Sequence, residues 1–338
     1  MAGNKRGAMA NIPITIAAGD YDRTRALRDG RVAVDGCEVT YLAMRPEELF
    51  FRAVRYAEFD VSELSLSTYI MQTQRGDSDY LAIPVFLSRV FRHSGFYIRT
   101  DRGIDKPEDL KGKTIGVPEY QMTAAVWQRG LLKDEYGIEA WDIAWRTGGL
   151  EQPGREERTP LDLPAKYDLA RIGPDQTLSA MLEAGELDAV ICPPVPSCLK
   201  HGAANVARLF PDYRAAEQDY YRRAGLCPIM HMVGVKKTVV EQHPWLPANL
   251  YKAFSRAKEL AIAELEEIGA LKISLPWVAA ELEATREILG DDIWPYGMEP
   301  NRAEIEALIR YSAEQNLTEP GLMPEALFAE TTLATAKL

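Results

Sequence analysis

The stretch SRVFRHSGFYIRTD, residues 88 to 101, gathers Arg89, Arg92 and His93 just before an apolar segment. An arginine guanidinium can hold a carboxylate with two parallel N–H donors, and an imidazole can donate a proton near neutral pH. In an extended chain Arg89 and His93 share one face and Arg92 takes the other, so all three converge only if the chain bends. We predict an anion-binding site with a proton donor here. The alternative is that the arginines are only the solvated ends of a strand.

Further polar groups follow predicted strands in the first third of the chain. Asp20 comes after the strand IPITIAA, and Arg25 lies in the short helix beyond it. Ser65 and Ser67 stand where a strand meets a helix, a place that suits anion binding and also plain N-capping. Glu63 lies in the same predicted buried strand, where a carboxylate is costly unless paired, so we expect it to pair with a cleft arginine.

The chain beyond residue 118 offers a matching set. Tyr120, Gln121 and Thr123 surround a predicted helix start in PEYQMTA, as ligand contacts or as a capping turn with a packed tyrosine. Ser197 follows the strand in ELDAVICPPVPS. His231 lies on a predicted strand, where a hydrogen-bonded core histidine is the alternative to a ligand contact.

Composition limits the partners that such a site could serve. The chain has 338 residues, enough for two domains, and a net charge of -11 from 39 basic and 50 acidic residues. An acidic chain is a poor match for nucleic acid or for an anionic membrane surface. A small anion remains possible, because a local cationic pocket can exist inside an acidic protein.

Cysteine and histidine spacing predicts no metal site. The 4 cysteines form no CxxC pair, and the 4 histidines form no HxH or HExxH arrangement. Residues 1–20 are charged and lack the apolar core of a signal peptide, and no later run is long enough to span a bilayer. We expect a cytoplasmic protein with a disordered segment over residues 1–11.

Strand and helix patterns alternate along the chain, which indicates an α/β fold. Residues 58–67 and 186–197 share an acidic, apolar, Asp, apolar start that runs through a strand to a hydroxyl-bearing turn. This echo fits two similar lobes whose strand ends and helix starts face a ligand. Residues 151–175 show no period and are expected to be loop, and the chain is mostly helical after residue 247.

Two stretches resemble a known superfamily. DLKGKTIGVPEYQMTAAVW and LSAMLEAGELDAVICPP resemble the second lobe of type II periplasmic (solute) binding proteins. The resemblance implies two α/β lobes with a ligand cleft between them and two crossing strands as hinge, near GFYIRTD and PIMHMVGV. Lobe one would comprise residues 12–97 and 229–338, and lobe two residues 98–228.

Five further stretches are similar to the 4,5-dihydroxyphthalate decarboxylase family: AAGDYDRTRALRDGRV, ELSLSTY, FLSRVFRHSGFYIRTDRGI, GVPEYQMTAAVWQRG and WRTGGLEQPGR. The similarity implies loss of one carboxylate from a dihydroxylated aromatic diacid, giving 3,4-dihydroxybenzoate and CO2, in phthalate degradation. Residues 156–175 match nothing in the family pattern.

That reaction needs a clamp for the retained carboxylate, an acceptor at a phenol and an acid near the ring carbon. It requires no organic cofactor. With the resemblance, we expect His93 to protonate the ring, Asp20 to accept the phenolic proton or orient His93, and Arg92 to grip carboxylate. The expected substrate contacts are Arg89, Arg25, Glu63, Ser65, Ser67, Tyr120, Gln121, Thr123, Ser197 and His231.

Three alternatives remain open at this stage. A non-catalytic binding protein for an aromatic carboxylate would need the same anion clamp. A biosynthetic enzyme of the pyrimidine-precursor type would need a cysteine cluster for iron, which the sequence lacks. A metal-assisted decarboxylase could use Asp20, Glu63 and His93. Apolar faces on the C-terminal helices suggest self-association.

Overall fold

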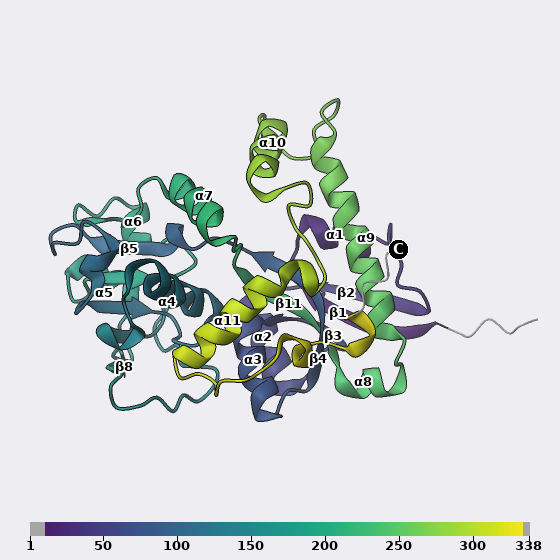
Figure 1. Ribbon diagram of the computed structural model, residues 1–338, viewed down its shortest axis with the longest axis horizontal. Helices are drawn as coiled ribbons and strands as arrows, with labels where there is room; N and C mark the ends of the chain where they lie inside the picture. Colours follow the sequence, from purple (N-terminus) through teal and green to yellow (C-terminus); the bar gives the residue numbers. More distant parts are fainter. Residues whose placement is uncertain (1–10, 334–338) are drawn as a thin grey trace, which may run out of the picture.

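The computed structural model describes residues 11–333 as two mixed α/β sheets, each covered by helices (Figure 1). In the first sheet, strand β11 runs antiparallel to both of its neighbours, and the others are parallel. Its order is β2 (Cys37–Ala43), β1 (Ile12–Ala18), β3 (Val61–Ser65), β11 (Ile229–Lys236) and β4 (Tyr80–Arg89). The second sheet has the order β10 (Val206–Arg208), β5 (Phe96–Arg99), β9 (Ala189–Ile191), β6 (Thr114–Val117), β7 (Ala144–Thr147) and β8 (Leu169–Arg171).

The helices follow the sheets. With the first sheet lie α1 (Asp22–Arg28), α2 (Pro46–Tyr56), α3 (Leu66–Arg75), α8 (Lys237–Gln242), α9 (Leu246–Glu266), α10 (Val278–Leu289) and α11 (Arg302–Glu314). With the second lie α4 (Thr123–Tyr136), α5 (Leu178–Ala184), α6 (Ser197–Lys200) and α7 (Tyr213–Ala224). None of the helices within residues 11–333 combines the length and apolar character needed to cross a bilayer.

The chain passes between the sheets twice, and the two passages lie side by side. The first covers residues 90–95 and the second residues 209–228, and the Val90 N–H donates to the Pro228 carbonyl at 3.1 Å. Strand β5 pairs only within the second sheet. We therefore propose that lobe one ends before residue 96, slightly earlier than the boundary at residue 97 that we expected. Part of the expected disordered segment, residues 1–10, lies outside the described residues.

Helix α11 extends from lobe one to pack on α4 of lobe two (Figure 1). The ring of Tyr311 meets Trp127 edge to face at 5.5 Å, and Gln315 accepts a hydrogen bond from the Nε of Arg129 at 2.7 Å. Gly130 is required here, because a Cβ would lie 2.4 Å from the Tyr311 ring. The two lobes are thus in direct contact on the side of α11 as well as at the passages.

Candidate functional site

A cavity of about 680 Å³ lies between the lobes. Lobe one contributes Phe50 of α2, Ser65 at the end of β3 and His231 of β11, and the first passage contributes Arg92. Lobe two closes the cavity with the start of α4 and with the loop of residues 149–158, most of which belongs to the stretch expected to be loop. The wall is therefore built from several parts of the chain that are remote in sequence.

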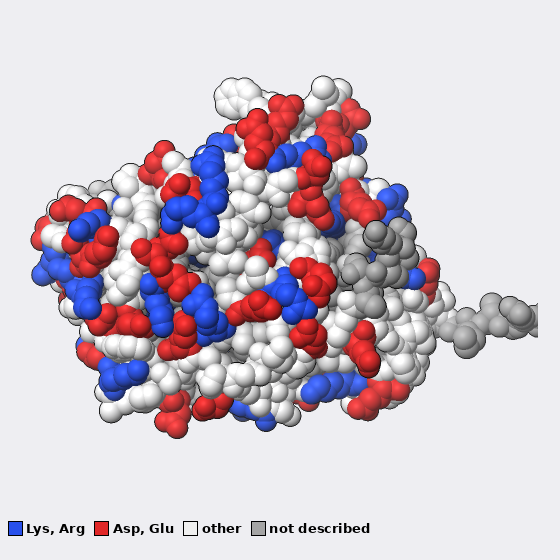
Figure 2. All heavy atoms as spheres, in the orientation of Figure 1, with Lys and Arg blue, Asp and Glu red and all other residues white. Residues whose placement is uncertain are grey.

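Cationic side chains dominate the charge of this cavity. Arg45, Arg92, Arg155 and Arg158 line it, against the carboxylates of Glu47 and Glu151. The outer surface is different, because basic and acidic side chains are interspersed on the face shown in Figure 2. The cationic pocket expected inside an acidic chain is present, and it can receive an organic anion.

Arg92 is the arginine best prepared for an incoming anion. Its Nε donates to the sulfur of Met230 at 3.2 Å, and among residues 11–333 it forms no ion pair. Burial lowers the pKa of Arg92 to about 10, and the nearby Glu217 carboxylate offsets part of that effect. The guanidinium is still cationic at neutral pH. A carboxylate beside it would replace the hydration that burial removes.

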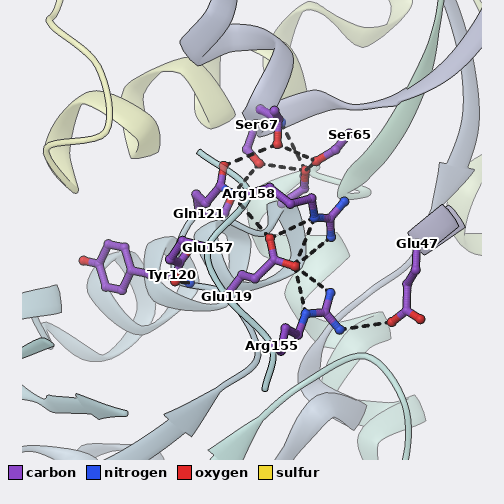
Figure 3. Close-up of polar contacts among 11 residues, drawn as sticks. Glu47, Ser65, Ser67, Glu119, Tyr120, Gln121, Arg155, Glu157 and Arg158 are labelled. Atoms are coloured by element: carbon purple, nitrogen blue, oxygen red, sulfur yellow. Dashed lines mark hydrogen bonds and ion pairs between the residues drawn. The ribbon is translucent and has the colours of Figure 1, made fainter. Parts of the chain in front are cut away.

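Arg155 and Arg158 are held by a buried carboxylate. Both guanidinium groups donate to Glu119, which is 2% exposed, with the shortest contact 2.6 Å from Arg155 Nη2 to Oε1 (Figure 3). Arg155 also reaches across the cleft to Glu47 of lobe one at 3.1 Å, and the Arg158 guanidinium lies over the ring of Phe50. These contacts order the loop and place two cations in the wall.

His231 is oriented by a second buried carboxylate, that of Glu63. Its Nδ1 lies 2.7 Å from Glu63 Oε1, which also accepts from the Tyr21 hydroxyl at 2.7 Å, while Oε2 accepts from the Gly19 N–H at 2.8 Å. Burial alone would raise the pKa of Glu63, but the hydrogen bonds from His231, Gly19 and Tyr21 outweigh it and hold that pKa below its usual range. The ionised carboxylate keeps the proton on Nδ1. Nε2 is then free for a ligand in the cavity.

The pairing of Glu63 differs from our expectation of a cleft arginine. Its partners are His231 and Tyr21, because β11 lies beside β3 and brings the imidazole next to it. This register could not be predicted from the sequence, since Glu63 and His231 are 168 positions apart.

Three hydroxyl groups join the starts of α3 and α4. Thr123 Oγ1 lies 2.9 Å from both Ser65 Oγ and Ser67 Oγ, and it accepts from the Ser67 N–H at 3.1 Å. Ser65 and Thr123 also line the cavity, while Ser67 is buried and donates to the Gln121 carbonyl at 2.6 Å. The predicted hydroxyl residues therefore converge from both lobes, and two of them can contact a ligand.

Four other predicted residues lie away from the cavity. His93 is 2% exposed and is packed against Phe210 and Tyr220, and its Nδ1 has no hydrogen-bond partner in the described part of the chain. Burial, together with the Arg223 charge, lowers the pKa of His93 to about 4, so it is neutral at physiological pH. The cavity wall also lacks Arg89, Asp20 and Arg25.

An ion pair in the core of lobe one explains the position of Arg89, and Asp20 lies at the exposed surface. Arg89 is buried and donates from Nη1 to Glu304 at 3.4 Å, so its charge serves the core of lobe one. Asp20 is exposed and pairs with Arg28 at 2.5 Å. Arg25 is part of α1, on lobe one. The bend needed to bring Arg89, Arg92 and His93 together is absent, since the short helix His93–Gly95 turns only Arg92 toward the cavity.

The last three predicted contacts act behind the wall. Tyr120 is wholly buried with its ring 3.7 Å from the Arg129 guanidinium carbon, so the packing interpretation holds for it. Gln121 is buried against the backbone of residues 158–159. Ser197 donates from its N–H at 2.7 Å and its hydroxyl at 2.6 Å to Glu151, and it thereby anchors the 149–158 loop.

Sequence reasoning missed Arg45, Arg155 and Arg158 as parts of the wall. Arg155 ends the family-like stretch WRTGGLEQPGR, but that resemblance gave it no role, and Arg158 has only the spacing in GREER, which by itself describes a solvated loop. Their position depends on Glu119, a carboxylate that the sequence places only next to a predicted helix start.

Within residues 11–333, the structure brings together no group of three His, Cys, Asp or Glu side chains that could hold a metal ion. Asp20, Glu63 and His93, the set considered for a metal-assisted reaction, lie in three different environments.

Comparison with known proteins gives two relatives of the same name. The chain is 45% identical over 330 residues to the 4,5-dihydroxyphthalate decarboxylase of Comamonas testosteroni, covering 98% of this chain and 100% of the relative. It is 49% identical over 214 residues to the 4,5-dihydroxyphthalate decarboxylase of Pseudomonas putida, covering 63% of this chain and 83% of that one. No family model matches the chain.

Solved structures support the architecture. The periplasmic aliphatic sulphonate binding protein SsuA of Escherichia coli matches with a TM-score of 0.53 and 13% identity, over 96% of this chain and 99% of that one. The alkanesulfonate-binding protein SsuA of Xanthomonas axonopodis pv. citri, bound to MOPS, matches with a TM-score of 0.52 and 12% identity, over 94% and 99%. The predicted two-lobe α/β fold of the binding-protein type is confirmed.

The 149–158 loop also contains a titratable group whose state we predict to affect stability. Glu157 accepts from the Tyr120 N–H at 2.6 Å, and its Oε2 has no hydrogen-bond partner within residues 11–333. Burial raises the pKa of Glu157 from 4.5 to about 7, an effect that the Tyr120 hydrogen bond partly offsets. The contribution of the protonated Glu157 carboxyl to the free energy of unfolding is complete below pH 4.5, and it is lost as the pH rises through about 7.

Replacing the Glu157 side chain by glutamine should remove the loss of stability at rising pH, because an amide does not ionise. We expect Glu157→Gln to gain roughly 1–3 kcal/mol in unfolding free energy relative to the unmodified protein between pH 5 and pH 8. Urea denaturation at several pH values measures it. The exposed neighbour Glu156 provides the control, because Glu156→Gln should run parallel to the unmodified protein. Parallel curves for Glu157→Gln as well would refute the prediction.

Proposed function

We propose that this chain, which belongs to the 4,5-dihydroxyphthalate decarboxylase family, converts 4,5-dihydroxyphthalate into 3,4-dihydroxybenzoate and CO2 in the cavity between its lobes. The identity of 45% over 98% of the chain supports the activity. The observation that carries the assignment to this cavity is the presence of four lining arginines beside a carboxylate-oriented imidazole. The arginines can bind an aromatic dianion, and the imidazole can supply the proton for the ring carbon.

The chemistry asks for one proton and no redox step. A deprotonated phenol para to one ring carbon pushes electron density there, and that carbon takes up a proton to form the new C–H bond. The C–C bond to its carboxylate then breaks, CO2 leaves, and the electron pair restores the aromatic ring. The second carboxylate stays on the product. The expected absence of an organic cofactor is part of this proposal.

His231 takes the role that the sequence assigned to His93. We propose that its Nε2 delivers the proton to the ring carbon, with Glu63 and Tyr21 holding the imidazole at Nδ1. A carboxylate hydrogen-bonded to Nδ1 stabilises the protonated imidazole and fixes its direction. Ser65 and Thr123 line the same cavity and are suited to hydrogen-bond the phenolic oxygens.

Arg92 is the proposed clamp for the retained carboxylate. It has no competing ion pair among residues 11–333, and it lies in the same cavity as His231. Binding energy from this remote group is available to hold the ring carbon against the proton donor. The cytoplasmic location and the self-association expected from the sequence stay predictions.

Product analysis tests the proposal directly. Metal-stripped protein is mixed with 4,5-dihydroxyphthalate, and CO2 and 3,4-dihydroxybenzoate are quantified over many turnovers. Equal amounts of both products support the proposal and a reaction without added metal. Tight binding without turnover, unchanged by added metals, would overturn it in favour of a binding protein for an aromatic carboxylate.

The proton donor is tested by substituting His231 and His93 one at a time with glutamine. We expect His231→Gln to lower kcat by about 10²–10⁴ with KM changed less than about threefold, because the acid is lost while the anion clamp stays. His93→Gln should keep kcat within about fivefold, since His93 lies outside the cavity. The exposed His201→Gln is the surface control. Steady-state kinetics measure the effects, and circular dichroism checks that each variant is folded. A larger loss of kcat in His93→Gln than in His231→Gln would identify His93 as the proton donor.

Removing the Arg92 guanidinium, the proposed carboxylate clamp, should raise KM. We expect Arg92→Gln to raise KM about 100-fold, as a charge-assisted pair of hydrogen bonds is worth about 3 kcal/mol in such a site. Arg28→Gln removes an exposed arginine outside the cavity and should leave KM unchanged. An Arg92→Gln variant with unaltered KM would show that the retained carboxylate binds elsewhere.

A further inference from the structure

We propose that Glu119 is a positioning residue that weakens the grip of Arg155 and Arg158 on the carboxylate that leaves. The inference rests on the proposed function and adds a division of labour within the cavity. Arg92 binds the retained carboxylate strongly, and the pair held by Glu119 binds the departing one weakly.

Glu119 engages the Nε and one Nη nitrogen of each guanidinium group. Arg155 donates to Oε1 from Nε at 2.8 Å and from Nη2 at 2.6 Å. Arg158 donates from Nε to Oε1 at 3.0 Å and to Oε2 at 2.9 Å, and from Nη2 to Oε1 at 2.9 Å. Figure 3 shows the carboxylate between the two guanidinium groups.

The guanidinium nitrogens that Glu119 leaves are the two Nη1 atoms. The Nη1 of Arg155 is used by Glu47, so the Nη1 of Arg158 is the guanidinium nitrogen of the pair without a hydrogen-bond partner among residues 11–333. The net charge of the two arginines and Glu119 is one positive unit. Arg92 presents the same unit charge with no carboxylate on it.

This asymmetry matches the asymmetry of the substrate. Both carboxylates of a phthalate are anionic before the reaction, but one of them becomes neutral CO2. A cation that binds the departing carboxylate strongly stabilises the reactant and loses that interaction in the transition state, which raises the barrier. Arg155 and Arg158 lose less interaction energy in the transition state, because Glu119 keeps both guanidinium groups paired when the departing carboxylate loses its charge.

A purely structural carboxylate would behave differently from a tuning one. If Glu119 only ordered the loop, its loss would loosen the arginines and raise KM. If it weakens their grip, its loss frees donors that bind the substrate more tightly. The sign of the change in KM therefore separates the two roles.

The experiment compares the unmodified protein with Glu119→Gln. We expect KM for 4,5-dihydroxyphthalate to fall about tenfold and kcat to fall by about the same factor. The inhibition constant of phthalate, which has both carboxylates but no hydroxyl groups, should also fall about tenfold, while that of benzoate should stay constant. Glu156→Gln, an exposed change in the 149–158 loop that carries Arg155, should leave all four constants unchanged.

An equal or higher KM in folded Glu119→Gln overturns the inference, as does an equal gain in affinity for benzoate. If the glutamine variant does not fold, Glu119→Asp is used, because it draws the carboxylate back from both arginines by one methylene. It should lower KM and kcat in the same directions by a smaller factor, and an unchanged or higher KM would again overturn the inference. Absence of turnover in the unmodified protein would instead refute the proposed function, while the phthalate and benzoate affinities would still test the clamp by calorimetry.

Discussion

Glu63 and Glu119 are carboxylates that water barely reaches, and a carboxylate in such a place must be paired. Leaving one buried charge without its partner costs several kcal/mol, so the partners are fixed as firmly as the carboxylates themselves. Glu63 fixes His231 and Tyr21 on the side of lobe one. Glu119 fixes Arg155 and Arg158 on the side of lobe two. The site is thus organised by two anions that lie behind the wall and hold His231, Arg155 and Arg158 in place, whereas Arg92 and Arg45 contact neither of them.

This arrangement explains how an acidic protein presents a cationic cavity. The net charge of -11 is spread over a surface where opposite charges are interspersed. Inside the cleft, partial burial limits the screening of Arg92, Arg155 and Arg158 by water, and the interaction of each with a bound carboxylate is stronger than at the surface. Selectivity for an anion therefore depends on where the few interior charges lie, and the total charge has little influence on it.

The sequence was sufficient for the fold and for part of the site. Alternating strand and helix patterns and the DLKGKTIGV stretch predicted two α/β lobes, because these signals are local. Ser65 and Thr123 could be placed at the cleft because each marks a helix start. His93 and Arg89 could not be judged, because neighbours in sequence turned to opposite sides at a short helical turn. The role of Arg155 and Arg158 depends on a carboxylate more than 35 positions away, and no local pattern records such a pairing.

The place of β11 in the first sheet has a consequence for biosynthesis. This strand lies between β3 and β4, although the whole of the second sheet separates it from them along the chain. While the ribosome is still making lobe two, β3 and β4 have no strand between them and their edges are unpaired, a state that invites aggregation. The second lobe can fold first, and the first sheet closes only when β11 emerges. The same step delivers His231 to Glu63, so the chain acquires its proposed proton donor at the moment when the facing edges of β3 and β4 become paired.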